Sequence, residues 1–139
     1  SVVEVDYSLL NRQPEEALLP YCAEQGIAVL VRGPLHKGML SGKYDARSTF
    51  GDQVRSTWNP GQPGRAQYER EIAVVDRLKE HLRPGEEMVT TALRYTISHP
   101  AKPVAIPGAK SPEQAIMNAA AGERALTDAE LADLRAVLG

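Results

Sequence analysis

The residues best suited to bind an anion lie between Val104 and Asn118, in the segment VAIPGAKSPEQAIMN. Ser111 is a strong N-cap candidate, Pro112 suits the first helical position, and Gln114 completes the capping-box spacing. The free N–H groups and positive partial charge of a helix start attract phosphate, and Lys110 adds a full charge beside them. The segment therefore suggests a phosphate site. Most capped helix starts bind nothing, and that alternative stays open on these residues alone.

Other reactive side chains are scattered along the chain. His36, His81 and His99 are widely spaced and lack Cys, Asp or Glu partners at metal-ligand intervals, so we expect no metal site. The single cysteine, Cys22, excludes an internal disulfide framework and is expected to be a small buried residue rather than a nucleophile. Trp58 has three open roles: covering a substrate, anchoring its loop or contacting another chain.

Alternating strand and helix signals position these residues. Three apolar runs predict strands, at residues 2–5, at residues 27–31, which should be covered on both faces, and at residues 104–106, which should enter a buried strand. Helical spacing predicts helices from about residue 17 to Gly26, over about residues 67–82 and 86–98, and after the N-cap candidates Ser111 and Thr127. Thr127 and Glu130 form a second capping box. The pattern therefore predicts an α/β chain.

A long polar stretch separates the second strand from the helix near residue 67. Residues 45–65 contain five glycines and prolines among polar residues. Loops of this length inside a compact domain are uncommon and are often functional or mobile. The stretch is therefore interpreted as a loop that either serves as a lid over a substrate or cofactor or is a disordered excursion.

Composition is typical of an ordinary globular domain. Hydrophobic residues make up 42% of the chain and charged residues 24%, and the net charge is −2, which argues against a nucleic-acid surface. No apolar run approaches the roughly 20 residues of a membrane helix. The start, SVVEVDYSLL, has no initiator methionine or basic leader, so we expect a mature or cut chain that begins inside a strand, in a cytoplasmic protein.

Three motifs together resemble one protein family. These are DYSLLNR at residues 6–12, GPLHKGMLSGKY at residues 33–44, and IPGAKSPEQ at residues 106–114 followed by Asn118. In this order and spacing they resemble the C-terminal half of an aldo-keto reductase, over nearly all of the chain. The resemblance is specific because three separate motifs agree.

The resemblance implies that this chain forms only part of a TIM barrel. Residues 1–139 would form a single domain, about half of a (β/α)8 TIM barrel, with the three strands as its sixth, seventh and eighth. Such a barrel needs about 250 residues, and this chain has 139, so it cannot close the barrel alone. The family's catalytic aspartate, tyrosine, lysine and histidine lie on earlier strands. No catalytic residue can therefore be transferred, and whether this chain alone is an enzyme stays open.

The resemblance also implies an NADP(H) site in two parts. The nicotinamide and pyrophosphate would be surrounded by Arg32, Gly33, Pro34, Leu35, His36, Lys37 and Lys43. The adenosine end would be surrounded by Gly108, Lys110, Gln114, Met117 and Asn118, with Lys110 placed for the 2′-phosphate. The residue types suit these roles, because glycines allow close backbone approach, lysines offset phosphate charge, and an asparagine both donates and accepts hydrogen bonds.

Three positions depart from the family pattern. Glu4 replaces a glutamine that hydrogen-bonds the nicotinamide amide, and an ionised carboxylate cannot donate. Arg32 replaces an aromatic residue that stacks on the nicotinamide ring, which brings a charge beside a ring that becomes cationic on oxidation. Met117 replaces an acidic adenine contact. Glu4 and Arg32 therefore change the expected contacts of the nicotinamide, and Met117 changes those of the adenine.

Two function classes follow. The first is the cofactor-binding part of an NADPH-dependent reductase of aldehydes or ketones. In that reaction the nicotinamide gives a hydride to the carbonyl, and a tyrosine outside this chain donates the proton. The second is a half-barrel that binds a nucleotide or a partner without catalysis. In either class, three strands with open edges and an uncovered apolar face should self-associate or pair with an N-terminal half.

Overall fold

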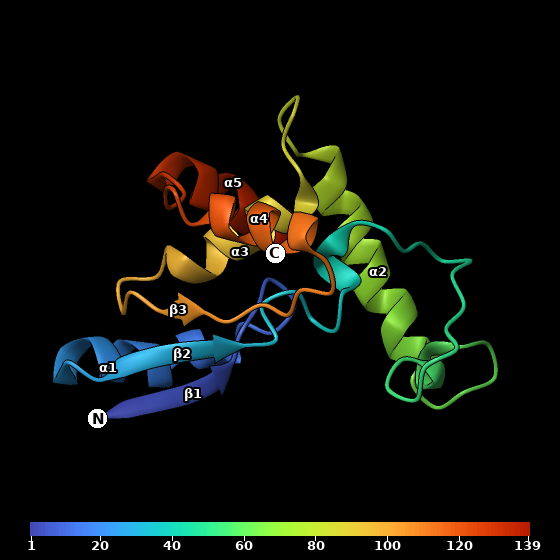
Figure 1. The fold of residues 1–139 in the computed structure, drawn as a ribbon, viewed down its shortest axis with the longest axis horizontal. Coiled ribbons are helices and arrows are strands. Elements are labelled where there is room, and N and C mark those ends of the chain that lie inside the picture. The colour runs from blue at the N-terminus through green and yellow to red at the C-terminus, as the bar shows by residue number, and fades with distance from the viewer.

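A three-stranded parallel sheet organises the fold in the computed structural model, which describes residues 1–139 (Figure 1). The strands are β1 (Val2–Asp6), β2 (Ala28–Arg32) and β3 (Val104–Ala105), in the order β1-β2-β3. Val2 pairs with Ala28, and Leu30 pairs with Val104. The three predicted strands are confirmed as parallel neighbours, so their carboxyl ends meet at one edge of the sheet.

Five α-helices accompany the sheet, together with three short 3-10 helices. The α-helices are α1 (Leu18–Gln25), α2 (Arg65–Glu80), α3 (Met88–Ile97), α4 (Pro112–Ala121) and α5 (Asp128–Leu138), and the 3-10 helices are η1 (Gln13–Glu15), η2 (Met39–Ser41) and η3 (Ser56–Trp58). The predicted helices are confirmed, with ends shifted by one or two residues. Gly26 ends α1 in the left-handed conformation, at φ 64°. No helix has the length and apolar character needed to cross a membrane.

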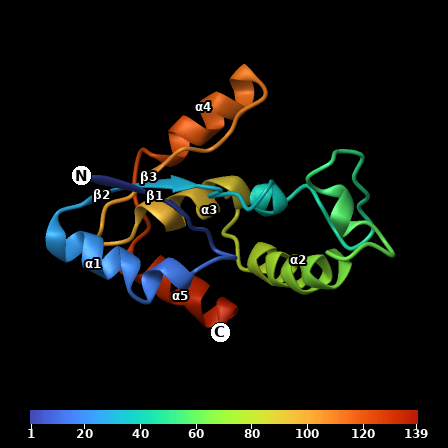
Figure 2. The same ribbon diagram turned by 90° about the horizontal axis from the view of Figure 1, so that it is seen from below.

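The two faces of the sheet differ in burial. Val29 and Val31 are 2% and 0% exposed and belong to the core. Side chains alternate along a strand, so Val2, Leu30 and Val104 share the opposite face. On that face Val2 is 62% and Val104 57% exposed. In Figure 2, α1 and α5 lie on one side of the strands and α4 on the other. The strand predicted at residues 104–106 therefore forms, but it is an exposed edge strand, because β2 is its sole neighbour in the sheet.

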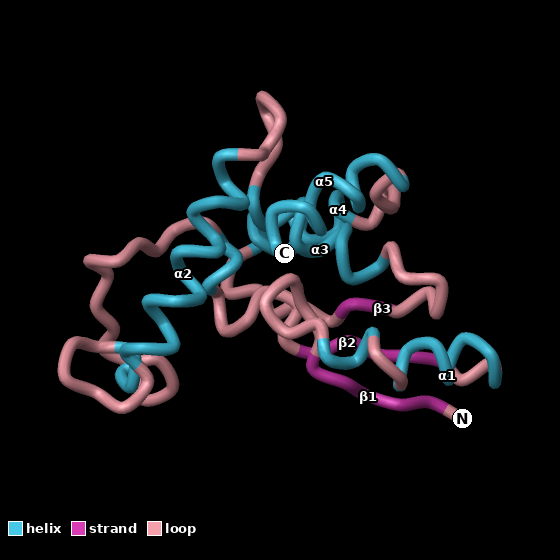
Figure 3. The backbone as a smooth tube through the Cα atoms, turned by 180° about the vertical axis from the view of Figure 1, so that it is seen from behind, coloured by secondary structure: helices cyan, strands magenta, loops and turns pink.

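Residues 45–64 wrap around the first turns of α2 as a loop that is irregular apart from η3 (Figure 3). The loop packs through an aromatic cluster, in which the Phe50 ring lies edge-on to Trp58 and Tyr68 at centroid distances of 5.3 and 5.6 Å. Asn59 links the two sides of the loop by accepting from the Phe50 N–H at 2.7 Å and donating to its carbonyl at 2.8 Å. The predicted loop is therefore an ordered part of the fold, and Trp58, at 6% exposure, anchors it.

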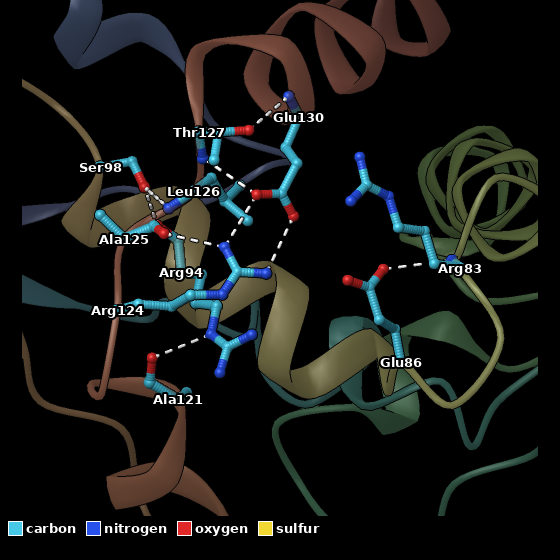
Figure 4. A network of polar contacts seen from close by, with 10 residues as sticks. All are labelled: Arg83, Glu86, Arg94, Ser98, Ala121, Arg124, Ala125, Leu126, Thr127 and Glu130. Atoms are coloured by element: carbon cyan, nitrogen blue, oxygen red, sulfur yellow. Dashed lines mark hydrogen bonds and ion pairs between the residues drawn. The ribbon is translucent and has the colours of Figure 1, made fainter.

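Hydrogen bonds join the end of α4 to α3 and fix the start of α5. Arg94 of α3 donates to the carbonyl of Ala121 at the end of α4, at 3.1 Å. Thr127 and Glu130 form the predicted capping box at the start of α5, and the Arg124 guanidinium donates to both carboxylate oxygens of Glu130, at 2.8 and 3.1 Å (Figure 4). Hydrogen bonds from Arg124 and then from the Thr127 backbone lower the pKa of Glu130 to about 2.

The half-buried carboxylate of Glu15, in η1, accepts hydrogen bonds from two buried tyrosines. The hydroxyl of Tyr7, just after β1, donates to Oε1 of Glu15 at 2.5 Å, and the hydroxyl of Tyr95 on α3 donates to the same oxygen. Tyr7 and Tyr95 are each 1% exposed. Burial, and after it the hydrogen bond to Glu15, raises the pKa of both tyrosines, that of Tyr95 to about 12. The triad fixes the end of β1, next to the edge where the candidate site lies.

Candidate functional site

The carboxyl ends of the strands bring the two predicted halves of the site to one edge. Residues 33–43 follow β2, and residues 106–111 lead from β3 into α4. The two segments leave the sheet side by side, because the N–H of Ile106 donates to the carbonyl of Val31 at 2.9 Å. In parallel α/β folds, ligands bind outside the carboxyl ends of the strands. This edge is therefore the candidate site.

The segment after β2 has an unusual backbone. Gly33 has φ +63°, a conformation that favours glycine, and a Cβ there would lie 3.1 Å from Oδ2 of Asp6, so a side chain would also crowd that carboxylate. His36, Lys37 and Gly38 then follow in succession with φ 50°, 56° and 86°. A left-handed conformation costs a non-glycine residue roughly 1–2 kcal/mol. Two such residues in a row point to a backbone shape that serves a purpose.

This shape leaves hydrogen-bond donors free. The N–H groups of Gly38 and Leu40 both turn inward to the carbonyl of Leu35, at 3.1 and 3.0 Å, whereas those of Leu35 and Lys37 donate to no protein atom. The predicted cations Arg32, Lys37 and Lys43 are exposed and make no side-chain hydrogen bond or ion pair. Backbone N–H groups of a turn together with neighbouring cations suit the phosphates of a nucleotide.

The side chain of His36 contacts helix α2. Its Nε2 lies 3.1 Å from Oε2 of Glu71 on α2, and the other carboxylate oxygen accepts from Gln67 at 2.9 Å. Burial raises the pKa of Glu71, but the hydrogen bonds from His36 and Gln67 outweigh burial and leave that pKa below its ordinary value. Glu71 is therefore held as a carboxylate behind the loop. No local sequence pattern points to Glu71.

Arg55 is a second residue next to the loop after β2 that no sequence motif indicated. Its Nη1 lies 3.6 Å from the position of a Cβ on Gly38, next to the Tyr44 ring. The guanidinium donates to the Tyr44 hydroxyl and pairs with Asp52 at 2.8 Å. The Asp52–Arg55 spacing is visible in the sequence, but nothing there shows that the long loop folds back on Gly38. The structure thus adds a fourth cation beside the residues after β2.

The segment before α4 is stabilised by its own predicted residues. Ser111 accepts from the N–H of Gln114 at 3.2 Å, and Pro112 is the first helical residue, as predicted. The other half of the predicted capping box is wrong, because the side-chain oxygen of Gln114 accepts from the N–H of Lys110 instead, at 2.7 Å. Asn118 donates to the carbonyl of Gly108 at 3.3 Å. These bonds order the connection and leave the Lys110 side chain exposed and without a polar partner.

The predicted cofactor residues are thus brought together at the level of segments. Those of residues 32–43 lie at the end of β2 and in the loop after it, and those of residues 108–118 lie in the connection after β3 and in α4; the two segments follow neighbouring strands. Glu4 is exposed on the uncovered face of β1, in register with Leu30. Pro34 is buried and Leu35 half-buried, so these two residues support the loop. The individual contacts with a cofactor stay predictions.

Known proteins share this fold. An NADH-specific methylglyoxal reductase of Escherichia coli is 30% identical over 139 residues, covering 96% of this chain and 40% of that protein. The glycerol dehydrogenase of Gluconobacter oxydans superposes with a TM-score of 0.77 at 26% identity, covering 99% of this chain and 42% of the other. An aldo/keto reductase from Klebsiella pneumoniae, solved with NADP and acetate, has a TM-score of 0.64 at 24% identity, covering 99% and 39%.

The chain spans 34–41% of the length of the first curated relatives that it matches. Its three parallel strands and their helices correspond to part of the TIM barrel of the structural neighbours. The model of the aldo/keto reductase family matches residues 1–138, a range that includes the whole sheet, all the helices and the candidate site. By this match the chain belongs to the aldo/keto reductase family.

Proposed function

We propose that this chain is the cofactor-binding portion of an NADP(H)-dependent reductase of aldehydes or ketones. One observation supports this most strongly: the unpaired donors and cations of residues 32–43 and the Lys110 segment follow neighbouring parallel strands, at the carboxyl edge of an aldo/keto reductase sheet. The two segments together offer separate positions for the pyrophosphate and for the adenosine end of one dinucleotide.

The residues fit such a cofactor in chemistry. Lys37, Lys43 and Arg55 offset the pyrophosphate charge, and the N–H groups of Leu35 and Lys37 donate to its oxygens. Gly33 allows the left-handed backbone, at φ +63°, with which this segment begins. When bound, NADPH supplies the hydride that reduces the carbonyl. The proton comes from a residue outside this chain, by family resemblance a tyrosine.

The preference for NADPH over NADH is assigned to Lys110. The E. coli relative is named as NADH-specific, and the Klebsiella structure holds NADP, so the family likeness leaves both nucleotides open. Lys110 is exposed and makes no side-chain hydrogen bond or ion pair. An ammonium group at the start of α4 is free to bind a 2′-phosphate, which NADH lacks.

A second candidate is a half-barrel that binds a nucleotide or a partner without catalysis. The exposure of Val2 and Val104 favours it, because an uncovered apolar sheet face is a surface for another chain.

Two measurements on the purified protein, of nucleotide binding and of turnover, distinguish the two candidates. NADPH and NADH are titrated by nucleotide fluorescence, and NADPH oxidation is followed with a panel of small aldehydes and ketones. Binding with turnover supports the reductase. Because the proton donor lies outside this chain, binding without turnover supports the second candidate only when it persists with the chain joined to an N-terminal half. Absence of nucleotide binding contradicts both nucleotide roles and leaves partner binding.

A further inference from the structure

A side-chain hydrogen bond links α2 to the candidate pyrophosphate loop. The Nε2 of His36 lies 3.1 Å from Oε2 of Glu71, and the two side chains are 20% and 16% exposed. Gln67, one turn earlier on α2, donates to the second oxygen of Glu71. The Glu71 carboxylate thus has one partner on its own helix and one in the loop.

This link acts on the strained part of the loop. His36 and Lys37 are both in the left-handed region without being glycine, so their conformation has to be held by contacts. Among residues 33–38, the His36 side chain alone hydrogen-bonds another element. The turn that it holds also contains the unpaired N–H groups of Leu35 and Lys37.

The rest of the loop is held separately. Met39 and Leu40 are 0% exposed and anchor the chain in the core. At the far end, Lys79 of α2 donates to the carbonyl of Tyr44 at 3.3 Å. Loss of the Glu71 contact would therefore free the His36 side chain and weaken the constraint on the backbone of residues 36 and 37, without detaching the loop from the protein.

We propose that Glu71 is a positioning residue for the nucleotide site: by holding His36 it keeps the backbone of residues 35–38 in the shape that presents its N–H groups to phosphate. This inference rests on the proposed function, because the phosphate belongs to the dinucleotide. Glu71 itself lies behind the loop and does not contact the cofactor. Its carboxylate acts on the cofactor only through His36.

The test compares Glu71→Ala with Glu71→Gln in the purified protein. The glutamine keeps one acceptor and offers one donor, and a histidine can take either role by changing tautomer. Glu80→Ala is the matched control, because Glu80 lies on α2, is exposed and makes no side-chain hydrogen bond or ion pair. Two quantities are measured for each variant: the NADPH dissociation constant, and the amide hydrogen exchange of residues 33–43 without nucleotide.

We expect Glu71→Ala to weaken NADPH binding about tenfold, which is the effect of losing a hydrogen bond to a charged group. It should also speed amide exchange at His36 and Gly38, whose N–H groups donate to the carbonyls of Gly33 and Leu35, while Glu71→Gln restores most of both quantities and Glu80→Ala changes neither. Unchanged exchange in Glu71→Ala overturns the positioning role, whatever the affinity. If the wild-type protein binds no NADPH, the proposed function fails and the nucleotide part of this inference fails with it. Exchange still decides whether Glu71 orders the loop.

Discussion

Lys110 carries the most specific single-residue prediction. We expect Lys110→Ala to weaken NADPH binding about tenfold or more, because a charge-assisted bond to phosphate is lost. NADH binding should stay nearly unchanged, because NADH has no 2′-phosphate. The check is a fluorescence titration of both nucleotides, with Lys102→Ala as control, since Lys102 is also an exposed lysine and lies before β3, away from α4 in the sequence. Equal losses for the two nucleotides would contradict the assignment.

Glu15 carries a prediction about stability. In Glu15→Ala, the buried hydroxyls of Tyr7 and Tyr95 lose their acceptor, and the expected cost is about 2–4 kcal/mol in the free energy of unfolding. Tyr95→Phe should cost less, because Glu15 keeps its bond from Tyr7. Urea denaturation of the two variants measures the difference. A smaller loss for Glu15→Ala than for Tyr95→Phe would contradict the shared-acceptor arrangement.

The pKa of Tyr95 also sets an alkaline limit. Folding raises that pKa from 10.0 to about 12. The stabilisation is therefore fully present below pH 10 and is lost as the pH rises towards 12. This part of the pH dependence should vanish in Tyr95→Phe.

Helix α5 depends on its cap. Glu130→Gln should lower the free energy of unfolding by about 1–2 kcal/mol, since the capping box and the bond from Arg124 are both weakened. The pKa of Glu130 falls from 4.5 to about 2 on folding, so the stabilisation is present above pH 4.5 and is lost as the pH falls towards 2. Denaturation curves between pH 7 and pH 2 measure both effects. Glu123→Gln, at an exposed glutamate without a side-chain partner, should leave the acid dependence unchanged.

The loop of residues 45–64 depends on Trp58. Trp58→Ala should cost about 3–5 kcal/mol, because a buried aromatic side chain is removed. The loop should also become a site of rapid limited proteolysis, since Phe50 and Tyr68 lose a packing partner. Trp58→Phe should retain most of the protection. Equal proteolysis of the wild-type protein and Trp58→Ala would show that the aromatic cluster does not hold the loop.

The open sheet leads to a prediction about association. Val2 and Val104 expose 62% and 57% of their surface on one face, and Ile106 beyond β3 exposes 47%. We propose that this face drives self-association or pairing with an N-terminal half. Sedimentation velocity over a range of concentrations should show species larger than 15.1 kDa. A stable monomer with cooperative melting at every concentration would contradict the proposal.

Several parts of the structure follow directly from local sequence. Apolar runs and helical spacing predicted the strands and helices, because each pattern lies within one segment. Gly26 ends α1 and Thr127 caps α5, since these preferences depend on a few adjacent residues. The motifs after β2 and before α4 likewise indicated the two halves of the candidate site, which parallel strands necessarily bring to one edge.

Contacts between distant segments were decided by the tertiary structure. His36 and Glu71 are separated by 35 positions, and no local pattern links them. Even over four positions, the backbone conformation decides that Gln114 accepts from the N–H of Lys110 and does not complete its capping box. Val104 is exposed although its apolar run suggested a buried strand, since burial depends on what covers a strand. Local preference selects the elements, whereas packing decides which side chains are left free to bind a ligand.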